Sequence, residues 1–552
     1  MIRKHLSTLS AAALLAAACS PSTSENVSEP TVGVVPPAAT VDYTSYTLPE
    51  LAALLDAGEI TSEALVTAYL TRIEAIDENG PAINAILSLN PDALEQAREI
   101  DARRAAGDFI GALAGVPVLL KDNIDTADNI PTTAGSLALA ENYAAMDAPL
   151  VAGLRSQGAI ILGKTNLSEW ANFRSNSSLS GWSGVGGHTR NPHVLDRQTC
   201  GSSAGSGAAM AAMLAAGTVG TETNGSIICP SQGNGIVGFK PTVGLVSQAG
   251  IVPISSSQDT AGPMTRTVEG AAMMLSAMAM GDTVHNYADM LSDTSLEGTR
   301  IGVLRYSVSD QPGLAEAFDA ALAVLEAEGA ELVEIDAFES QVENFGQKAF
   351  TVLIHEFKTT LNEYLAGTPD TVQTRTLSDL IAFNEAHSEE ELAIFGQDLF
   401  TMADATNGIE DEVYADASAD VLRATRELGI DFLLAEYNVD VLVSPSGPIM
   451  PVAVPTEPDV WPSWSGAGGL AAVAGYPHLT VPMGTVGRVP VGLSFMGTAG
   501  QDADILSYGY DYEQASLMRA TPAFLEHSDA PTPDRGASGD DETSSDEPVT
   551  EE

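Results

Sequence analysis

The sequence predicts an α/β protein, a single large domain whose central mixed, twisted β-sheet is covered by helices. Apolar segments at 113–120 and 159–163 have the length and composition of buried strands, and the segment around 150–156 has helical spacing. Such alternation is typical of a sheet with helices on its faces. The chain has 552 residues, 44% of them apolar, and no internal Pro/Ser-rich linker divides it.

The N-terminus has the features of an export signal. Residues 1–19 combine a basic start, a short apolar run and small residues, which predicts a signal peptide too short to span a membrane. Cys19 follows three alanines as in a bacterial lipoprotein processing site, although Ala16 stands where Leu is usual. Lipidation of Cys19 would give a membrane-anchored lipoprotein, and ordinary cleavage in the alanine run would give a periplasmic protein.

The segment at 20–41 lacks apolar periodicity and is predicted to be a flexible linker. The domain itself spans 42–525 and begins with two helices, whose apolar residues recur every three or four positions. Thr61 or Ser62 can cap the second helix. The apolar residues are Leu51, Leu54 and Leu55 in the first helix and Leu65, Val66, Tyr69, Leu70, Ile73 and Ile76 in the second.

Later elements continue the alternation. The apolar segment at 113–120 ends at Lys121, and Pro149 suits the first turn of the helix before the second strand. Residues 340–430 are acidic and mostly helical, as expected of a cover over a site, and no chemistry is assigned to them. The remaining predicted elements are strands at 299–304, 331–335, 439–443 and 478–481 and a helix at 314–328.

The chain is strongly acidic. It has 74 Asp and Glu residues against 24 Lys and Arg, a formal net charge of −50 at pH 7. Such a surface repels phosphate backbones and anionic lipids, which argues against nucleic-acid binding. Residues 526–552 concentrate acidic residues among Gly, Ser, Pro and Thr, which predicts an acidic disordered tail.

Several motifs occur as strings without the structural context they need. Gly233–Gly238 fits the dinucleotide pattern G-x-G-x-x-G, but Pro241 opposes the helix that this pattern must open. Gly201–Gly207 lacks the Gly-Lys-Ser/Thr ending of a P-loop, and the G-x-S-x-G string around Ser203 lacks a buried strand before it. His355 has no second histidine four residues later, and no metal or other cofactor is expected.

The stretch from 200 to 238 contains two loops rich in Gly and Ser, one opening at Gly201 and one ending at Ser226, with a helical segment between them. Serine can supply a nucleophilic oxygen when a base is near. Lys121 is the candidate base, since burial can lower a lysine pKa from about 10.4 by roughly 3–5 units. Alone, a lysine at a strand end or a serine in such a loop is usually structural, whereas their combination favours catalysis.

Eight motifs follow one another along residues 46–520. They are V-P-V-L-L-K-D-N-I-D around Lys121, T-T-A-G-S at 132–136, G-A-I-I-L-G-K-T-N at 158–166, C-G-S-S-A-G-S at 200–206, G-T-E-T-N-G-S-I ending at Ile227, G-F-K-P-T-V-G at 238–244, D-T-A-G-P-M-T-R at 259–266 and A-G-Y-P at 474–477. This series resembles the amidase signature family of serine hydrolases. The resemblance implies that family's fold and an amidase that hydrolyses linear amide C–N bonds.

The resemblance also implies roles for individual residues. The family's Ser–cis-Ser–Lys triad falls on Ser226 as the nucleophile that forms an acyl-enzyme, Ser202 as proton relay and Lys121 as base. The backbone N–H groups that correspond to its oxyanion hole belong to Thr223, Asn224, Gly225 and Ser226.

The chain departs from the family pattern at a few positions. Cys200 and Ala204 replace glycines, and Asn224 replaces Gly or Asp. Ile228 stands where many members carry Arg, and the absence of that positive charge favours neutral substrates. Together with N-L-S-E-W-A-N-F-R-S at 166–175, the wording is closest to the peptide amidase-type branch, whose members act on peptide amides or simple amides. The triad should bring the loops of Cys200 and Cys229 together, and the sequence leaves open whether these thiols form a disulfide.

The leading interpretation is therefore an exported hydrolase of peptide amides or small neutral amides, tethered to a membrane if Cys19 is lipidated. One alternative is the amidase (glutaminase) component of a tRNA-dependent amidotransferase, against which the export signal and the acidic charge argue. The other is a surface lipoprotein that binds peptides or amides without turnover. No oligomeric state is predicted.

Overall fold

The computed structural model describes residues 41–108, 110–280 and 286–532. The described residues from Asp42 onward belong to one unit. The predicted signal peptide with Cys19, the linker up to residue 40 and the tail after residue 532 lie outside the described residues. No helix in the described ranges is long and apolar enough to cross a membrane.

Eleven strands in the described ranges form one sheet. They are β1 Ile86–Leu89, β2 Pro117–Lys121, β3 Ile160–Thr165, β6 Gly217–Glu222, β7 Val237–Lys240, β8 Thr260–Thr265, β9 Arg300–Leu304, β10 Glu331–Ile335, β11 Val441–Pro445, β12 His478–Val486 and β13 Val489–Met496, in the spatial order β1-β3-β2-β6-β8-β7-β12-β13-β11-β9-β10. β2 runs parallel to β3 and β6, and β9 runs parallel to β10 and β11, whereas β8 is antiparallel to both of its neighbours. The mixed sheet confirms the predicted fold class. A separate hairpin consists of β4 Trp182–Ser183 and β5 Gly187–His188.

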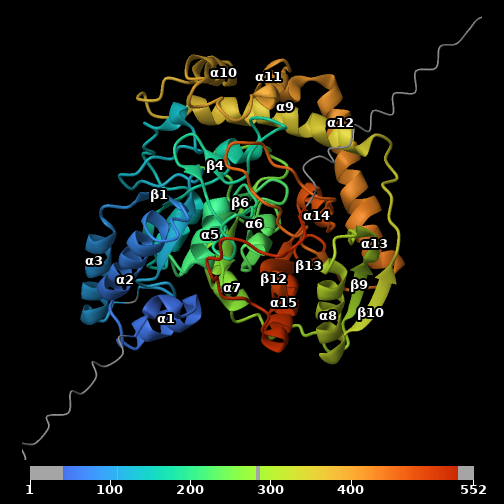
Figure 1. Ribbon diagram of the computed structural model, residues 1–552, viewed down its shortest axis with the longest axis horizontal. Coiled ribbons are helices and arrows are strands. Elements are labelled where there is room, and N and C mark those ends of the chain that lie inside the picture. Colours follow the sequence, from blue (N-terminus) through green and yellow to red (C-terminus); the bar gives the residue numbers. More distant parts are fainter. Residues whose placement is uncertain (1–40, 109, 281–285, 533–552) are drawn as a thin grey trace, which may run out of the picture. The chain divides into compact units, whose positions relative to one another are not determined.

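Helices flank this sheet (Figure 1). They are α1 Leu48–Asp56, α2 Ser62–Ile73, α3 Ala93–Ala106, α4 Pro149–Ser156, α5 Ala204–Ala211, α6 Ile228–Gly233, α7 Val268–Met278, α8 Leu314–Ala327, α9 Phe345–Ala366, α10 Leu377–Ala386, α11 Asp398–Asp404, α12 Glu412–Thr425, α13 Asp431–Glu436, α14 Gly468–Ala474 and α15 Asp502–Ser516. The predicted helical content of 340–430 is confirmed, and we call α9 to α12 with their connections the helical cover. In Figure 1, α9, α10 and α11 gather together at the top of the view.

The structure explains where the predicted boundaries hold and where they differ. Thr61 caps α2 by accepting a hydrogen bond from the backbone N–H of Ala64, as the sequence allowed. β2 begins only at Pro117, because the chain turns at Gly115, whose φ of 81° suits glycine. It ends at Lys121 as predicted.

Residues 526–532, predicted as the start of a disordered tail, instead lie against the domain. The buried Arg197 guanidinium donates hydrogen bonds to the backbone oxygens of Ser528, Ala530 and Pro531 at 3.3, 2.7 and 3.1 Å. A buried guanidinium needs acceptors, and these carbonyl groups supply them. The composition of the segment carried no sign of this partner, which lies more than 300 residues away.

The helical cover is attached to the rest of the domain by buried charges. Arg174 forms ion pairs with Glu169 and, at 3.4 Å, with Glu391, and all three side chains are fully buried. Its guanidinium also stacks over the ring of Phe395 at 4.0 Å. Glu391 and Phe395 belong to the cover, whereas Glu169 and Arg174 follow β3, so this cluster joins the two parts.

Candidate active site

Lys121 and Ser202 are in direct contact. Lys121 is the last residue of β2 and is fully buried. Its Nζ donates to Ser202 Oγ at 2.7 Å and to Thr221 Oγ1 at 2.8 Å. The peptide bond between Gly201 and Ser202 is cis. The lysine and the serine that the resemblance paired are thus hydrogen-bonded although 81 residues separate them.

Ser226 lies in the neighbouring loop, between β6 and α6, and is half-buried. The backbone N–H of Ser203 donates to the carbonyl oxygen of Ser226 at 3.2 Å. Cys200 and Cys229 form a disulfide with a Cα–Cα distance of 5.8 Å, which answers the question the sequence left open. The two Gly/Ser-rich loops are therefore linked by a hydrogen bond and by a covalent bond.

The segment Thr223–Ser226, here called the oxyanion turn, continues directly from β6. Gly225 adopts a φ of 84° that suits glycine. At the far end of the turn, Glu222 Oε2 accepts hydrogen bonds from the backbone N–H groups of Ile227 at 2.8 Å and Ile228 at 3.0 Å. These bonds hold the start of α6, because the first N–H groups of a helix lack partners within it.

Burial sets the protonation of Lys121. Because its ammonium group is fully buried, the pKa of Lys121 falls to about 7, and the nearby charges of Asp259 and Glu222 oppose this shift without cancelling it. A lysine with this pKa has a substantial neutral fraction at neutral pH, and only the neutral amine can accept a proton. The environment thus supports a basic role for this side chain.

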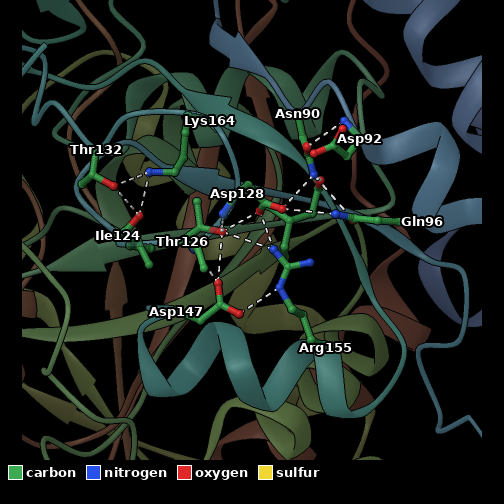
Figure 2. Close-up of polar contacts among 12 residues, drawn as sticks. Asn90, Asp92, Gln96, Ile124, Thr126, Asp128, Thr132, Asp147, Arg155 and Lys164 are labelled. Atoms are coloured by element: carbon green, nitrogen blue, oxygen red, sulfur yellow. Dashed lines mark hydrogen bonds and ion pairs between the residues drawn. The ribbon is translucent and has the colours of Figure 1, made fainter. Parts of the chain in front are cut away.

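A second buried lysine, Lys164 of β3, is bound differently (Figure 2). Its Nζ lies 3.4 Å from the Asp122 carboxylate and donates to the Ile124 oxygen at 2.7 Å and to Thr132 Oγ1 at 2.8 Å. All these partners belong to the loop that follows Lys121. Lys164 therefore fixes that loop and, unlike Lys121, has a carboxylate partner.

The same loop is held from a second point shown in Figure 2. Asp128 accepts hydrogen bonds from Asn90 Nδ2 at 3.1 Å and Gln96 Nε2 at 3.2 Å, and it pairs with Arg155 of α4. Arg155 also binds Asp147 at 2.9 Å. Anchored in this way from α3 and α4, the loop supports the end of β2 where Lys121 lies.

Three polar residues beside the site were missed in the sequence. Thr221 Oγ1 accepts from Lys121 and also from Asn123 Nδ2 at 3.0 Å, and Asp259 Oδ1 accepts from Thr223 Oγ1 at 2.6 Å. Each lies inside one of the family motifs, and that was the only signal available for them. Their contacts depend on the sheet order, which places β2, β6 and β8 side by side.

The structure also explains the motifs that were set aside. Ser203 Oγ donates to the Thr221 oxygen at 3.1 Å and accepts from the Thr221 N–H at 3.2 Å, so this serine has a structural role. α6 ends at Gly233 and β7 begins at Val237, so Gly233–Gly238 opens no helix. In the described part of the chain, no three His, Cys, Asp or Glu side chains are placed to hold a metal ion.

A cavity of about 340 Å³ opens beside the oxyanion turn. Its wall includes Gly201, the disulfide, Leu353 of α9 and the indole rings of Trp461 and Trp464. A second cavity of about 400 Å³ borders the same turn and shares Trp464 with the first. Its other walls carry the polar side chains of Glu222, Ser446 and His478 beside larger apolar ones, namely Ile228, Tyr306, Phe338, Phe345, Leu470 and Val473. Both are large enough for a small organic ligand.

The fold and this arrangement of a buried lysine, two serines and a backbone turn beside a cavity define an amide-hydrolysing enzyme. The chain belongs to the amidase signature family, since the family model described as Amidase matches residues 64–506. The resemblance seen in the motifs is thereby confirmed.

Individual relatives agree with this membership. A probable amidase of Arabidopsis thaliana is 36% identical over 502 residues, which cover 87% of this chain and 91% of that protein. The solved native peptide amidase from Stenotrophomonas maltophilia is 45% identical, with a TM-score of 0.82 over 87% of this chain and 99% of that one. A glutamyl-tRNA(Gln) amidotransferase subunit from Salinispora tropica is 34% identical over 84% of this chain and 95% of its own length.

Proposed function

We propose that this amidase is an exported enzyme that hydrolyses peptide amides or small neutral amides through an acyl-enzyme on Ser226. The observation that carries the proposal is the 2.7 Å contact between Lys121 Nζ and Ser202 Oγ, in a buried site one loop away from Ser226. A lysine with a pKa of about 7 that contacts a hydroxyl group is suited to general base catalysis near neutral pH.

In acylation, the Ser226 hydroxyl attacks the amide carbon while its proton passes to Ser202, and the Ser202 proton passes to neutral Lys121. The N–H groups of the oxyanion turn receive the negative charge on the former carbonyl oxygen. Protonated Lys121 then returns a proton through Ser202 to the leaving nitrogen. The C–N bond breaks, which releases ammonia or an amine and leaves the acyl group esterified to Ser226.

In deacylation, a water molecule takes the place of the amine. Lys121, again neutral, accepts a proton from this water through Ser202 as the water oxygen attacks the ester carbon. The tetrahedral intermediate collapses, the free acid leaves, and the proton on Lys121 returns to the Ser226 oxygen. Each cycle thus consumes one amide and one water.

Two features support a neutral substrate. The second cavity has mostly apolar walls, Ile228 stands where a positive charge would attract an anionic group, and the Glu222 carboxylate in its wall would repel one. The solved relative at 45% identity is a peptide amidase, and an amidated peptide C-terminus carries no carboxylate. A hydrophobic pocket with a few convergent polar groups is the usual form of a small-molecule site.

The proposed export rests on the N-terminal sequence and on the Cys200–Cys229 disulfide. Disulfides persist mainly in oxidising compartments. Fractionation of cells that express the full chain tests export. Replacement of Cys19 by Ser tests the membrane tether, because loss of the lipidated residue should move the protein from the membranes to the soluble periplasmic fraction. A protein that stays in the cytoplasm would overturn both the proposed export and the proposed membrane tether.

A second candidate comes from the relatives named as glutamyl-tRNA(Gln) amidotransferase subunits. If the chain had that function, it would release ammonia from glutamine for a partner that binds tRNA. The net charge of −50 works against a tRNA nearby. Comparing the isolated chain on glutamine and on peptide amides separates the two candidates: a preference for glutamine would favour the amidotransferase.

The deciding experiment measures ammonia release from amidated peptides and simple amides. Ser226→Ala should abolish release, because the acyl-enzyme cannot form, and Ser177→Ala, at an exposed neighbouring serine, should leave it unchanged. Mass spectrometry of the quenched wild-type enzyme should detect an acyl adduct on the peptide that contains Ser226. Release that survives Ser226→Ala would overturn the mechanism, and binding without any release would indicate the non-catalytic alternative.

A further inference from the structure

We propose that Asp259 is a positioning residue that holds the oxyanion turn in place and connects it to the helical cover. The inference rests on the proposed function, since the turn has this role only if Ser226 is the nucleophile. It gives the cover, which the sequence left without chemistry, a part in the reaction.

The first contact joins Asp259 to the turn. Asp259 is buried, with 9% of its surface exposed, and its Oδ1 accepts a hydrogen bond from Thr223 Oγ1 at 2.6 Å. Thr223 is the first residue of the turn, and its backbone N–H is one of the proposed oxyanion donors. A short bond to a charged acceptor restrains the residue more strongly than a neutral partner would.

The second oxygen of Asp259 binds its own loop. Oδ2 accepts from the backbone N–H groups of Ile254 at 2.7 Å and Ser255 at 2.9 Å. Asp259 directly precedes β8, whose first residue Thr260 pairs with Glu222 at the end of β6. The carboxylate therefore bridges the oxyanion turn and loop 254–259 at the point where the two strands meet.

The same loop is bound from the other side by the cover. Glu356 of α9 is fully buried, and its Oε2 accepts from Ser255 Oγ and from the N–H and Oγ of Ser257 at 3.1 and 3.0 Å. Its Oε1 accepts from the Tyr414 hydroxyl of α12 at 2.7 Å. A continuous chain of hydrogen bonds thus runs from α12 and α9 through the loop to Asp259 and Thr223.

The negative charge of Asp259 acts on the pKa of Lys121, an effect that a purely structural residue would not have. The ionisable groups that act on the pair of Asp259 and Lys121 are Glu222 of β6 and Glu356 of α9. The Asp259 carboxylate raises the pKa of Lys121 against the effect of burial, and burial raises the pKa of Asp259 itself to about 6. Removing this negative charge should therefore make Lys121 lose its proton at a lower pH.

The test compares Asp259→Asn with wild type in steady-state kinetics on an amidated peptide. Asn keeps one acceptor oxygen and loses the other, so kcat should fall about tenfold to a hundredfold with a smaller change in KM. The acidic limb of the pH profile of kcat/KM should move to lower pH. Glu363→Gln, on the exposed face of the same helix as Glu356, serves as the matched control and should change neither quantity.

Three further variants locate the effect. Thr223→Val removes only the hydroxyl donor and should lower kcat about tenfold without moving the acidic limb. Because both changes act on the contact between residues 223 and 259, their effects on kcat should not add, and the double variant should be less impaired than the product of the two single losses predicts. Glu356→Gln should lower kcat by loosening the loop.

The outcomes separate this inference from the proposed function. If wild type releases no ammonia, or if Ser226→Ala still does, the proposed function fails. If both behave as expected and folded Asp259→Asn retains the wild-type kcat and pH profile, only the positioning role is overturned. Should Asp259→Asn fail to fold, Thr223→Val and Glu356→Gln decide, and wild-type kcat in both variants would overturn the proposal.

Discussion

The two buried lysines on β2 and β3 differ in their partners, and this difference separates their roles. Lys164 lies 3.4 Å from a carboxylate, whereas the contacts of Lys121 are hydroxyl and carbonyl oxygens of Ser202 and Thr221. Burial lowers the pKa of both lysines, and the carboxylate beside Lys164 opposes this shift. The hydroxyl partners of Lys121 satisfy its amine without balancing a positive charge, and its pKa falls to about 7. The lack of a carboxylate partner suits Lys121 to its proposed role as base, and it also makes the buried ammonium group costly for the folded state.

Replacing Lys121 by Met should therefore remove most activity and stabilise the fold. Loss of the base should lower kcat/KM by about 10²–10⁴. The native pKa lies below the unfolded value of 10.5, so the lysine destabilises the folded state most below pH 7, and less as the pH rises toward 10.5. After subtracting the lost hydrogen bonds, Lys121→Met should gain about 1–2 kcal/mol near neutral pH.

Denaturant unfolding of both proteins across this pH range checks the prediction. The stability difference should shrink steadily in alkali. A variant less stable than wild type at every pH would show that the hydrogen bonds to Ser202 and Thr221 outweigh the desolvation of the ammonium group.

At this scale the sequence identified the residues to which the family resemblance assigns a role in the reaction, and it missed those whose role depends on contacts that the fold creates. Lys121, Ser202 and Ser226 were singled out because the resemblance assigns each of them a place in the proposed triad. Asp259 and Glu356 were not, because their partners Thr223 and Ser255 lie 36 and 101 residues away along the chain. A carboxylate in a polar loop gives no sequence signal of such a partner.

The strands of the sheet show the same limit for whole elements. β3 and β9 were predicted because they contain runs of Ile, Val and Leu, whereas β6 (G-T-V-G-T-E) and β8 (T-A-G-P-M-T) have weak strand propensity and were missed. Every residue of β6 and β8 is nevertheless buried. Their small residues allow close packing: a Cβ on Gly262 would lie 2.0 Å from the Phe239 oxygen.

The disulfide between the two loops should contribute both stability and activity. It closes a loop with a sequence separation of 29, for which the loss of chain entropy in the unfolded state predicts about 3–4 kcal/mol. Replacing both Cys200 and Cys229 by Ser should lower the midpoint of urea unfolding accordingly, and should lower kcat because the two loops would move independently. Cys19→Ser is the matched control, and a double variant with wild-type stability and kcat would contradict the prediction.

The buried charge cluster at the cover predicts unequal effects of its members. Arg174→Met leaves two fully buried carboxyl groups without their cation and should cost about 3–5 kcal/mol. Burial raises the pKa of Glu169 well above its usual value, so the cluster already tolerates a neutral acid group. Glu391→Gln should accordingly cost much less, and chemical denaturation of the two variants tests this order. Equal losses would show instead that Glu391 matters as much to the cluster as its cation does.

Across the whole molecule the dominant property is the excess of 50 negative charges. Repulsion between like charges opposes the compact state, and salt screens it over about 10 Å at an ionic strength of about 0.1 M. We therefore expect the melting temperature to rise by a few degrees between about 20 mM and about 500 mM KCl. Sucrose at equal osmolality controls for solute exclusion, and a melting temperature that falls with salt would show that attractive ion pairs dominate instead.

The position of Trp464 has a spectroscopic consequence. Its side chain borders both cavities and is 52% exposed, and its ring centroid lies 5.9 Å from that of Trp461, whereas Trp170 and Trp182 are largely buried. A ligand in either cavity would exclude water from this indole, and indole emission shifts to the blue when water leaves. The protein thus carries an intrinsic fluorescent reporter in the walls of both cavities beside the candidate site. In the Ser226→Ala enzyme, binding of unlabelled amides could be timed through this reporter alone.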